Sequence, residues 1–556
     1  MRKIILLFLL IPLASHSQDK NLEKKFDSVL HSYVNHDKPG FTAGVISDGK
    51  ILYLKGFGVE DIETRQRITT QTKFQADDLA KQFTVLSMLQ LEQEGKLSFE
   101  DDVRKYLPNL PKYNYILKVK HLINHSSGLH NLDPVKELLG LRRNDIFTHE
   151  DAVKIISSQE KLNFKPGSQF SYHRSDTELI LMVEIVKAVS KQSFIEYTKQ
   201  HLFEALGMTN TFFHNDNSMF QNMAKSYLIE KKISYNPKRD FTLGVTNLYT
   251  TAEDFAKWFQ TYHLNKNFSN LVKKLDTYVA LDSGKEFAST WGKVTLGRYY
   301  DHPERGLPKM SWQFGLTGGY GANFFRYQSH KLVSFVLGNN NSYNGMPAML
   351  LANQIMEKEY KEPEEIDYSK IKTKRLSLRN LKKLEGFYYD KTNSIVREIY
   401  VKNDTLRYKR VESNRETPML ALSNNKFQLY QRGDIEVFIT FTNNTFEISS
   451  LNSDVSIYDK VNIVESSALR LSDYSGHYYN KELDVILKFS LEENALTTSS
   501  LRINPIRFYP IIKDSFRSNT FIFSGIQFTR EDDIVSGFNI NTDGVSNLYF
   551  EKIKWN

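Results

Sequence analysis

Three short segments of this chain carry side chains whose types and spacing suggest chemistry. Asp78 precedes Lys81 by three residues, a Tyr-His-Arg run lies at 172–174, and a Leu-Thr-Gly-Gly run lies at 316–319. A carboxylate such as that of Asp78 is already ionised and is a weak, well-solvated nucleophile. His173 is the imidazole of this set, and it is a candidate general base for a water molecule.

Composition and spacing exclude several other kinds of site. The chain has no cysteine, which excludes disulfides, thiolate metal sites and a cysteine nucleophile. Its His, Asp and Glu residues show no spacing such as His-x-x-x-His, so we predict neither a metal site nor a cofactor. The Gly-Gly-Tyr-Gly run at 318–321 precedes a strand and aromatic residues, so it is not a phosphate loop. His125 is expected to have a structural role.

The overall composition is that of an ordinary globular protein. Of its 556 residues, 40% are hydrophobic and 25% are charged, which excludes a wholly disordered or collagen-like chain. The length predicts about two to four domains. The net charge of +8 is small and spread along the chain, so we predict no nucleic-acid partner, although this charge would mildly favour acidic surfaces in the cell envelope.

The N-terminus has the pattern of a secretory signal peptide. Arg2 and Lys3 precede an apolar run over 4–13, and a small-x-small site follows at 15–17. A membrane anchor is the alternative, but this apolar run is shorter than the roughly 20 residues that span a bilayer. We therefore expect cleavage of residues 1–17, no transmembrane segment afterwards, and a periplasmic or secreted protein.

The elements that must position the three segments change in kind along the chain. Helical periodicity over 82–94 and 178–190 alternates with strand patterns such as 331–338. This predicts a mixed α/β (α+β) domain over 18–360. The highly charged stretch that follows predicts a linker over 361–376.

Short alternating strands dominate the rest of the chain. The segments LEGFYYDK (384–391) and YSGHYYNK (474–481) align, and each is followed by a strand, a turn and another strand. This weak internal repeat predicts two similar antiparallel β modules, over 377–465 and 466–556. Chance similarity of tyrosine-rich strand starts is one alternative, and a single closed barrel over the whole region is another.

The first domain resembles a known family, the serine β-lactamases and penicillin-binding proteins, in the branch with class C enzymes, D,D-peptidases, esterases and D-aminopeptidases. The resemblance extends through most of residues 22–360, and it depends on the order and spacing of several blocks together. These blocks are KGFGVEDIETRQRITTQTKF (55–74), KQFTVLSMLQLEQEGKLSFEDDVRKYLP (81–108), VKHLINHSSGLHNL (119–132), FKPGSQFSY (164–172), HLFEALGMTNTFF (201–213) and GLTGGYGANFF (315–325).

In that family an S-x-x-K motif supplies a serine that attacks a carbonyl and a lysine that helps to move the proton. A Tyr-x-Asn loop supplies a second proton carrier and an amide contact. A strand with Lys or His followed by Thr-Gly binds the carboxylate side of the substrate, and two backbone N–H groups stabilise the oxyanion. The resemblance places Lys81 at the motif lysine and Asp78 at the position of the nucleophilic serine.

The other two motifs are also changed. Tyr172 keeps the tyrosine of the second motif, whereas Arg174 stands where the resemblance implies asparagine. In the third motif Leu316 takes the place of Lys or His. The three residues that follow it on the substrate-binding strand are Thr317, Gly318 and Gly319.

These substitutions predict a protein whose catalysis is lost or strongly impaired. Loss of the nucleophile in such a site costs on the order of a million-fold in turnover. The backbone N–H groups of Asp78 and Gly319 would remain as oxyanion donors, but the fixed carboxylate would repel an oxyanion and most acidic substrates. We expect Asp78, Lys81 and Arg174 to form a buried ion network that fills the site. Independent drift of these residues, or simple pairing of Lys81 with Asp77, is the alternative.

The sequence therefore predicts a secreted pseudoenzyme that acts by binding. The resemblance implies a ligand from the envelope, such as a peptidoglycan stem peptide or another D-amino-acid peptide, or else a protein partner. Two alternatives stay open. One is an active hydrolase of the same family that works through an unorthodox residue, and the other is a structural or interaction protein that works through its C-terminal β modules.

Overall fold

The structure is a computed structural model. The predicted signal peptide lies mostly outside the residues that it describes, and so do Tyr172, His173 and Arg174. The described residues are 16–554 without 143, 172–175, 217, 219–221, 265–267, 290, 303–307, 343–345, 357–364, 392–393, 433–434, 451–454, 494, 501, 521–522 and 543.

An antiparallel sheet of eight strands forms the centre of the first domain, as predicted for a mixed α/β fold. Its strand order is β10-β11-β12-β13-β14-β15-β1-β2, so the first and last strands of the domain are neighbours. The strands are β1 (Phe41–Ser47), β2 (Lys50–Phe57), β10 (Ala288–Ser289), β11 (Gly292–Val294), β12 (Tyr300–His302), β13 (Met310–Thr317), β14 (Tyr320–Tyr327) and β15 (Leu332–Gly338).

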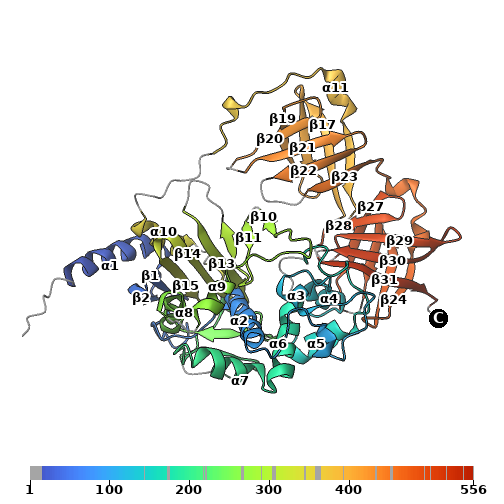
Figure 1. Cartoon of the computed structure of the whole chain (residues 1–556). Helices are drawn as coiled ribbons and strands as arrows, with labels where there is room; N and C mark the ends of the chain where they lie inside the picture. Colours follow the sequence, from blue (N-terminus) through green and yellow to red (C-terminus); the bar gives the residue numbers. More distant parts are fainter. Residues whose placement is uncertain are drawn as a thin grey trace, which may run out of the picture.

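Helices cover both faces of this sheet (Figure 1). Helices α1 (His16–Leu30) and α10 (Met346–Ile355) share one apolar cluster with strands β1, β2 and β15. Helices α2 (Lys81–Gln93), α6 (Thr177–Ser190) and α8 (Ala252–Leu264) belong to the larger cluster on the opposite face.

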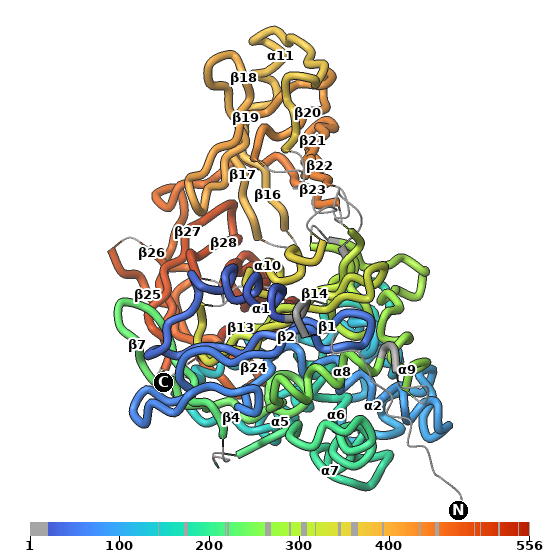
Figure 2. Tube along the Cα trace, turned by 90° about the vertical axis from the view of Figure 1, so that its left-hand side faces the viewer, coloured from blue at the N-terminus to red at the C-terminus, as the bar shows by residue number. Residues whose placement is uncertain are grey.

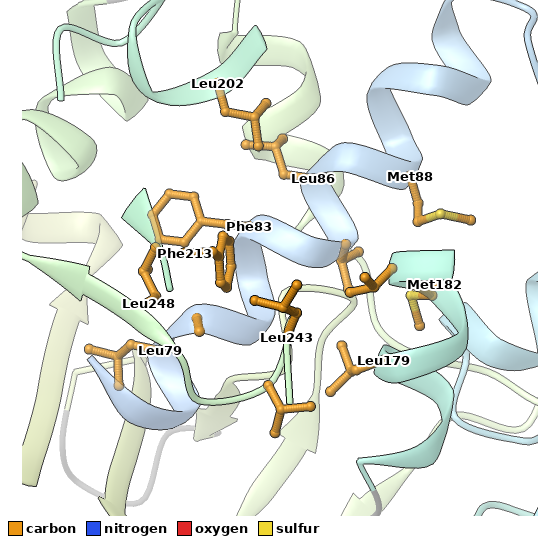
Figure 3. Packing of buried hydrophobic residues seen from close by; sticks show 14 of the residues in the cluster. Leu79, Phe83, Leu86, Met88, Leu179, Met182, Leu202, Phe213, Leu243 and Leu248 are labelled. Atoms are coloured by element: carbon orange, nitrogen blue, oxygen red, sulfur yellow. The ribbon is translucent and has the colours of Figure 1, made fainter. Parts of the chain in front are cut away.

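Helix α2 lies in the middle of the larger cluster and is buried around most of its circumference. Figure 3 shows Met88 of α2 close to Met182 of α6, whereas Leu86 lies toward Leu202 and Phe83 toward Phe213. A helix that is buried on most sides needs apolar or satisfied residues all round. The N-terminus of α2, where Lys81 lies, is thereby held rigidly against α6 and the sheet.

Shorter elements connect this framework. The other helices of the domain are α3 (Val119–Ile123), α4 (Leu132–Leu138), α5 (His149–Ser158), α7 (Phe194–Thr198) and α9 (Ser269–Lys274). The short strands are β3 (Phe74–Gln75), β4 (Phe147–Thr148), β5 (Phe212–Phe213), β6 (Tyr227–Ile229), β7 (Ile233–Tyr235), β8 (Asp240–Phe241) and β9 (Leu248–Thr250). None of the helices that the structure describes is long and apolar enough to cross a membrane.

The C-terminal region forms two closed antiparallel barrels, which confirms the predicted β modules and excludes one common barrel. Helix α11 (Leu378–Lys383) precedes the first barrel. The first contains β16 (Gly386–Asp390), β17 (Ile395–Lys402), β18 (Thr405–Arg410), β19 (Arg415–Ala421), β20 (Lys426–Leu429), β21 (Val437–Thr442), β22 (Thr445–Ser450) and β23 (Ser456–Val461). The second contains β24 (Gly476–Asn480), β25 (Val485–Glu492), β26 (Ala495–Ser499), β27 (Ile506–Ile512), β28 (Ser515–Ser518), β29 (Gly525–Glu531), β30 (Ile534–Thr542) and β31 (Val545–Ile553).

The internal repeat has a structural basis at the first strand of each barrel. Gly386 and Gly476 have φ angles of 143° and 142°, and a Cβ there would meet the side chain of Lys460 or Lys552 respectively. The interiors of both barrels are filled, largely by aromatic rings that contact one another at edge-to-face or tilted angles. The repeated Gly-Phe/His-Tyr-Tyr segment is therefore a closure element of a packed barrel.

The second barrel packs against the first domain (Figure 1, red, beside α4). Val135 and Leu138 of α4 are fully buried in the same cluster as Leu483 and Val545 of the barrel. A shared apolar core of this kind stabilises the contact through burial, at about 25 cal/mol per Å² of apolar surface. The second barrel and helix α4 of the first domain therefore share one hydrophobic core.

Polar contacts fix the orientation of this interface. The Asn163 side chain donates to the carbonyl of Gly544 (2.9 Å) and accepts from the backbone N–H of Ser546 (2.6 Å). At the edge, Arg502 pairs with Asp145 at 2.6 Å. The two Asn163 bonds satisfy backbone groups at the start of β31 that would otherwise lose their hydrogen bonds to water at the contact.

The first barrel contacts the second one. Tyr389 and Val396 of the first barrel share a small buried cluster with Ile511. A Cβ at Gly525 would lie 1.9 Å from the Ser394 hydroxyl, so only glycine permits this approach. Figure 2 shows the first barrel (orange) at the end of the molecule, beyond the second one (red). The barrel that is later in sequence thus lies nearer to the first domain than the earlier one.

We predict that Leu138→Asp will release the second barrel, because it places a carboxylate in the shared apolar core. Amides over 544–548 should exchange with deuterium at least about tenfold faster, whereas amides over 437–450 in the first barrel stay unchanged. Hydrogen exchange read by mass spectrometry checks this. Leu378→Asp, at an exposed leucine of α11, is the control, and equal effects of the two variants would contradict the interface.

Candidate functional site

The chain enters the candidate site through a strained turn before α2. Strand β3 pairs with β9, and Asp77, two residues after the end of β3, has a positive φ of 48°. A single 3₁₀ turn, Asp77–Ala80, then leads directly into α2 at Lys81. Non-glycine residues with positive φ are uncommon, and aspartate is among the better tolerated. This turn places Asp78 at the N-terminal end of α2, next to the central sheet.

Strand β13 fixes the backbone of Asp78 from the other side. A Cβ at Gly315 would lie 2.7 Å from the backbone nitrogen of Asp78, so glycine is needed for this close approach. The Gln313 side chain donates to the carbonyl oxygen of Asp78 at 2.7 Å. The strand that leads to the Leu316–Gly319 segment therefore lies against the position of the family's nucleophile.

The central interaction of the site is an ammonium shared by two carboxylates. Lys81 Nζ lies 2.8 Å from Asp78 Oδ1 and 3.0 Å from Asp176 Oδ1. The side chain of Lys81 is 10% exposed, against 38% for Asp78 and 24% for Asp176. The predicted contact between Asp78 and Lys81 is present. The second carboxylate, Asp176, comes from the residue just before α6.

The protonation of this group follows from its surroundings. Burial alone would lower the pKa of Lys81, but the charges of Asp176 and Asp78 outweigh burial and raise that pKa above its usual range. Burial raises the pKa of Asp176 to about 7, and the attraction of Lys81 offsets only part of this rise. One ammonium cannot compensate two carboxylates fully. Near neutral pH Lys81 is therefore protonated, while the Asp176 carboxyl group is partly protonated and partly ionised.

A second buried carboxylate, that of Glu178, lies two residues after Asp176. Glu178 accepts from the Ser127 hydroxyl at 2.7 Å, and its other oxygen lies 3.4 Å from His125 Nδ1. Burial would raise the pKa of Glu178, but the charge of His125 and these hydrogen bonds lower it to about 2. This pair joins the turn at 125–127 to the start of α6. It gives His125 a partner that matches the structural role expected for it.

The third segment forms the turn between β13 and β14. Gly318 and Gly319 both have positive φ angles, of 62° and 93°. The Asn236 side chain donates to the carbonyl of Gly318 at 2.5 Å, and the backbone of Tyr227 approaches Gly319 too closely for a Cβ. Leu316 is 42% exposed and brings neither charge nor a hydrogen bond to this edge.

The structure brings the first and third predicted segments together, through the contact of Gly315 with Asp78. The second segment lies outside the described residues, so the predicted contact of Arg174 with Asp78 stays a prediction. Sequence reasoning missed Asp176 and Glu178. The available signal was their position directly after the 172–174 segment and at the start of a predicted helix. Within the described part of the chain, no group of three or more His, Asp or Glu residues is arranged to hold a metal ion.

Replacing Lys81 by methionine tests the energetic weight of this interaction. Lys81→Met leaves Asp78 and Asp176 side by side without a cation. Removal of one partner from a fully buried ion pair costs about 3–5 kcal/mol, and we expect a smaller loss here because the Asp78 side chain is 38% exposed. Urea unfolding followed by circular dichroism measures this loss. Lys105→Met, in the exposed pair with Asp101, should change stability little. Equal losses for the two variants would contradict a buried network.

The raised pKa of Asp176 predicts a pH dependence with a defined sign. The folded chain keeps the Asp176 proton up to about pH 7, whereas the unfolded chain releases it near pH 4. Because the folded state binds more protons in this window, stability falls as pH rises through it. Asp176→Asn should reduce that fall in thermal unfolding between pH 4 and 7. Asp404→Asn, in an exposed hairpin turn, should leave the wild-type profile unchanged.

Comparison with known proteins identifies relatives of this chain at low sequence identity. In Staphylococcus aureus (strain MRSA252), "Protein flp" is 27% identical over 284 residues, which are 48% of this chain and 55% of that protein. The putative penicillin-binding protein PbpX of Bacillus subtilis (strain 168) is 28% identical over 258 residues, or 46% of this chain and 62% of that protein. The chain thus spans little more than half the length of the curated relatives it matches.

Solved structures support the fold alone at these levels of identity. The octameric penicillin-binding protein homologue from Pyrococcus abyssi has a TM-score of 0.53 and 22% identity, and the match covers 79% of this chain and 99% of that one. The penicillin-binding protein from Bacillus halodurans has a TM-score of 0.50 and 19% identity, over 60% of this chain and 99% of that one. The beta-lactamase family model matches residues 22–354, more than half of the chain. With the sheet, the buried helix α2 and the order of the motifs, this match shows that the chain belongs to the beta-lactamase family.

Proposed function

We propose that this protein is a member of the beta-lactamase family that has lost covalent catalysis and acts by binding. The observation that carries this proposal is the position of the Lys81 ammonium between the carboxylates of Asp78 and Asp176. Two functions of an active site are lost together in this arrangement. The nucleophile is replaced, and the group that would accept its proton is held in the protonated form.

The replaced nucleophile is the first part of the argument. An acyl-enzyme forms in this family when a serine oxygen attacks a carbonyl. Attack by the Asp78 carboxylate would instead give an anhydride, which water hydrolyses rapidly. The carboxylate is also bound to Lys81 at 2.8 Å, which lowers its nucleophilicity further.

The blocked base is the second part. A lysine can accept a proton only when its amine is neutral. Both neighbouring carboxylates favour the charged form of Lys81. Asp176 would still raise the pKa of Lys81 if a serine stood at position 78. The site is therefore impaired twice, and restoring one residue should not restore full reactivity.

The proposed ligand follows from the family and from the charges that remain. Asp78 is the more exposed of the two carboxylates, and Leu316 supplies no cation to bind a substrate carboxylate. We propose that this site binds a peptide from the cell envelope, such as a peptidoglycan stem peptide or another D-amino-acid peptide, or a protein partner. The name of the Bacillus subtilis relative, a putative penicillin-binding protein, supports such a ligand. The N-terminal pattern supports delivery to the periplasm or the exterior.

A second candidate is a hydrolase that uses the two carboxylates themselves. Asp176, with a pKa raised to about 7, can donate a proton near neutral pH, and Asp78 lies on the same ammonium. Carboxyl groups in different environments can divide the roles of acid and base. The third alternative, binding through the barrels, would use their outer surfaces, because their interiors are filled.

Covalent labelling by a fluorescent penicillin distinguishes these functions. We expect no labelling of the wild type and slow labelling of Asp78→Ser. The double variant Asp78→Ser/Asp176→Asn should react at least about tenfold faster at pH 7, because each unit by which the pKa of Lys81 falls raises its neutral fraction about tenfold. Asp78→Asn/Asp176→Asn, which lacks any hydroxyl at position 78, is the matched control.

Wild-type labelling that survives Asp78→Asn would exclude the proposal. Turnover of a nitrophenyl ester by the wild type, lost in both Asp78→Asn and Asp176→Asn, would favour the carboxylate hydrolase instead. Binding without labelling is measured separately, by titrating the wild type with a D-alanyl-D-alanine peptide.

A further inference from the structure

A separate pocket lies on the outer side of α6, away from the candidate site. Its volume is about 370 Å³, and it is formed by α5, α6 and the segment over 106–110. Asp176 and Glu178 reach the candidate site from the N-terminal end of α6, whereas Ala188 and Lys191 line this pocket at the C-terminal end. At 1.5 Å per residue, Glu178 and Ala188 are about 15 Å apart along the helix. Pockets of this size are typical of sites for small ligands.

The walls of the pocket are mainly apolar. Leu107, Leu110 and Pro108 form one side, and Val153 of α5 with Leu181 and Ala188 of α6 form the other. Leu181 and Leu110 also belong to the buried core, so the floor is part of the rigid interior. A preformed apolar floor binds hydrocarbon without the cost of ordering a loop.

The charges at the rim leave a net positive charge. Glu184 is bound by Lys187 at 2.6 Å and by His149 Nε2 at 2.9 Å, and its pKa is lowered because these contacts outweigh its burial. Lys187 and Glu184 therefore compensate each other. Lys191 ends α6 in the left-handed conformation, with φ of 60°, and the described part of the chain provides no ion-pair partner for its exposed ammonium.

We propose that this pocket binds a single-chain amphiphile with one anionic head group. The hydrocarbon chain lies between α5 and α6 on the apolar floor, and the head group pairs with Lys191 at the rim. Lys187 has three N–H donors and uses one for Glu184, so it can also donate to the head group. A cationic head group would meet Lys191 unfavourably, and a fully polar ligand would leave the apolar walls without a partner.

Isothermal titration of the whole protein with dodecanoate tests this site, with dodecyltrimethylammonium as the ligand of equal chain length and opposite charge. Both are used below the concentration at which they form micelles. We expect dodecanoate to bind at least about tenfold more tightly than the cation, which corresponds to one favourable charge contact. Ala188→Trp should abolish binding of both, because the indole fills the space between the helices. Val153→Trp fills the same pocket from α5, and it replaces Ala188→Trp in this experiment if that variant fails to fold.

Lys191→Gly removes the rim charge without strain, since glycine accepts the left-handed conformation. It should weaken dodecanoate binding about tenfold and strengthen binding of the cation, because the repulsion by Lys191 is lost. Lys331→Gly, at another lysine with a positive φ, is the matched control and should change neither affinity. The proposal is overturned if dodecanoate does not bind, if both filling variants bind it like the wild type, or if Lys191→Gly and Lys331→Gly behave alike. Self-association that is lost in Ala188→Trp, without dodecanoate binding, would assign the pocket to a second copy of this chain. Neither result depends on the proposed loss of catalysis.

Discussion

The Lys81 ammonium, bound by Asp78 on one side and Asp176 on the other, is the interaction on which the candidate site depends. A buried ammonium is costly unless carboxylates or hydrogen bonds replace the water that it loses. Here the replacement comes from two different elements, the turn before α2 and the residue before α6. The same contacts that offset the loss of hydration of the buried ammonium keep its proton in place. Stability and loss of basicity therefore have one physical cause.

The scaffold around this interaction is that of the beta-lactamase family, and glycines allow close backbone approaches beside Asp78. Gly315 still permits β13 to lie against the backbone of Asp78, and the turn after it still needs glycine at 318 and 319. Backbone geometry of this kind depends on glycine and on sheet register, so it survives when side chains change. A retained backbone with a paired carboxylate at position 78 fits the proposed role in binding without turnover.

The two barrels extend the molecule in an order that differs from their order in the chain. The second barrel shares an apolar core with α4, and the first barrel packs against the second one. Because α4 follows the turn that carries His125 and Ser127, the second barrel adjoins the elements that hold Glu178.

The sequence by itself predicted the mixed α/β domain and the nearness of Asp78 to Lys81, and it favoured two antiparallel modules over a single barrel. Hydrophobic periods and turn residues are local properties, and residues three apart at a helix start are neighbours whatever the rest of the chain does. Only the tertiary structure decided that Asp176 binds the same ammonium, that Glu178 pairs with His125, and that the second barrel, and not the first, covers α4. These contacts join residues far apart in the chain, and they depend on how α2, α6 and the barrels pack as whole bodies. Periodicity along a sequence records which face of an element is buried, but not which other element buries it.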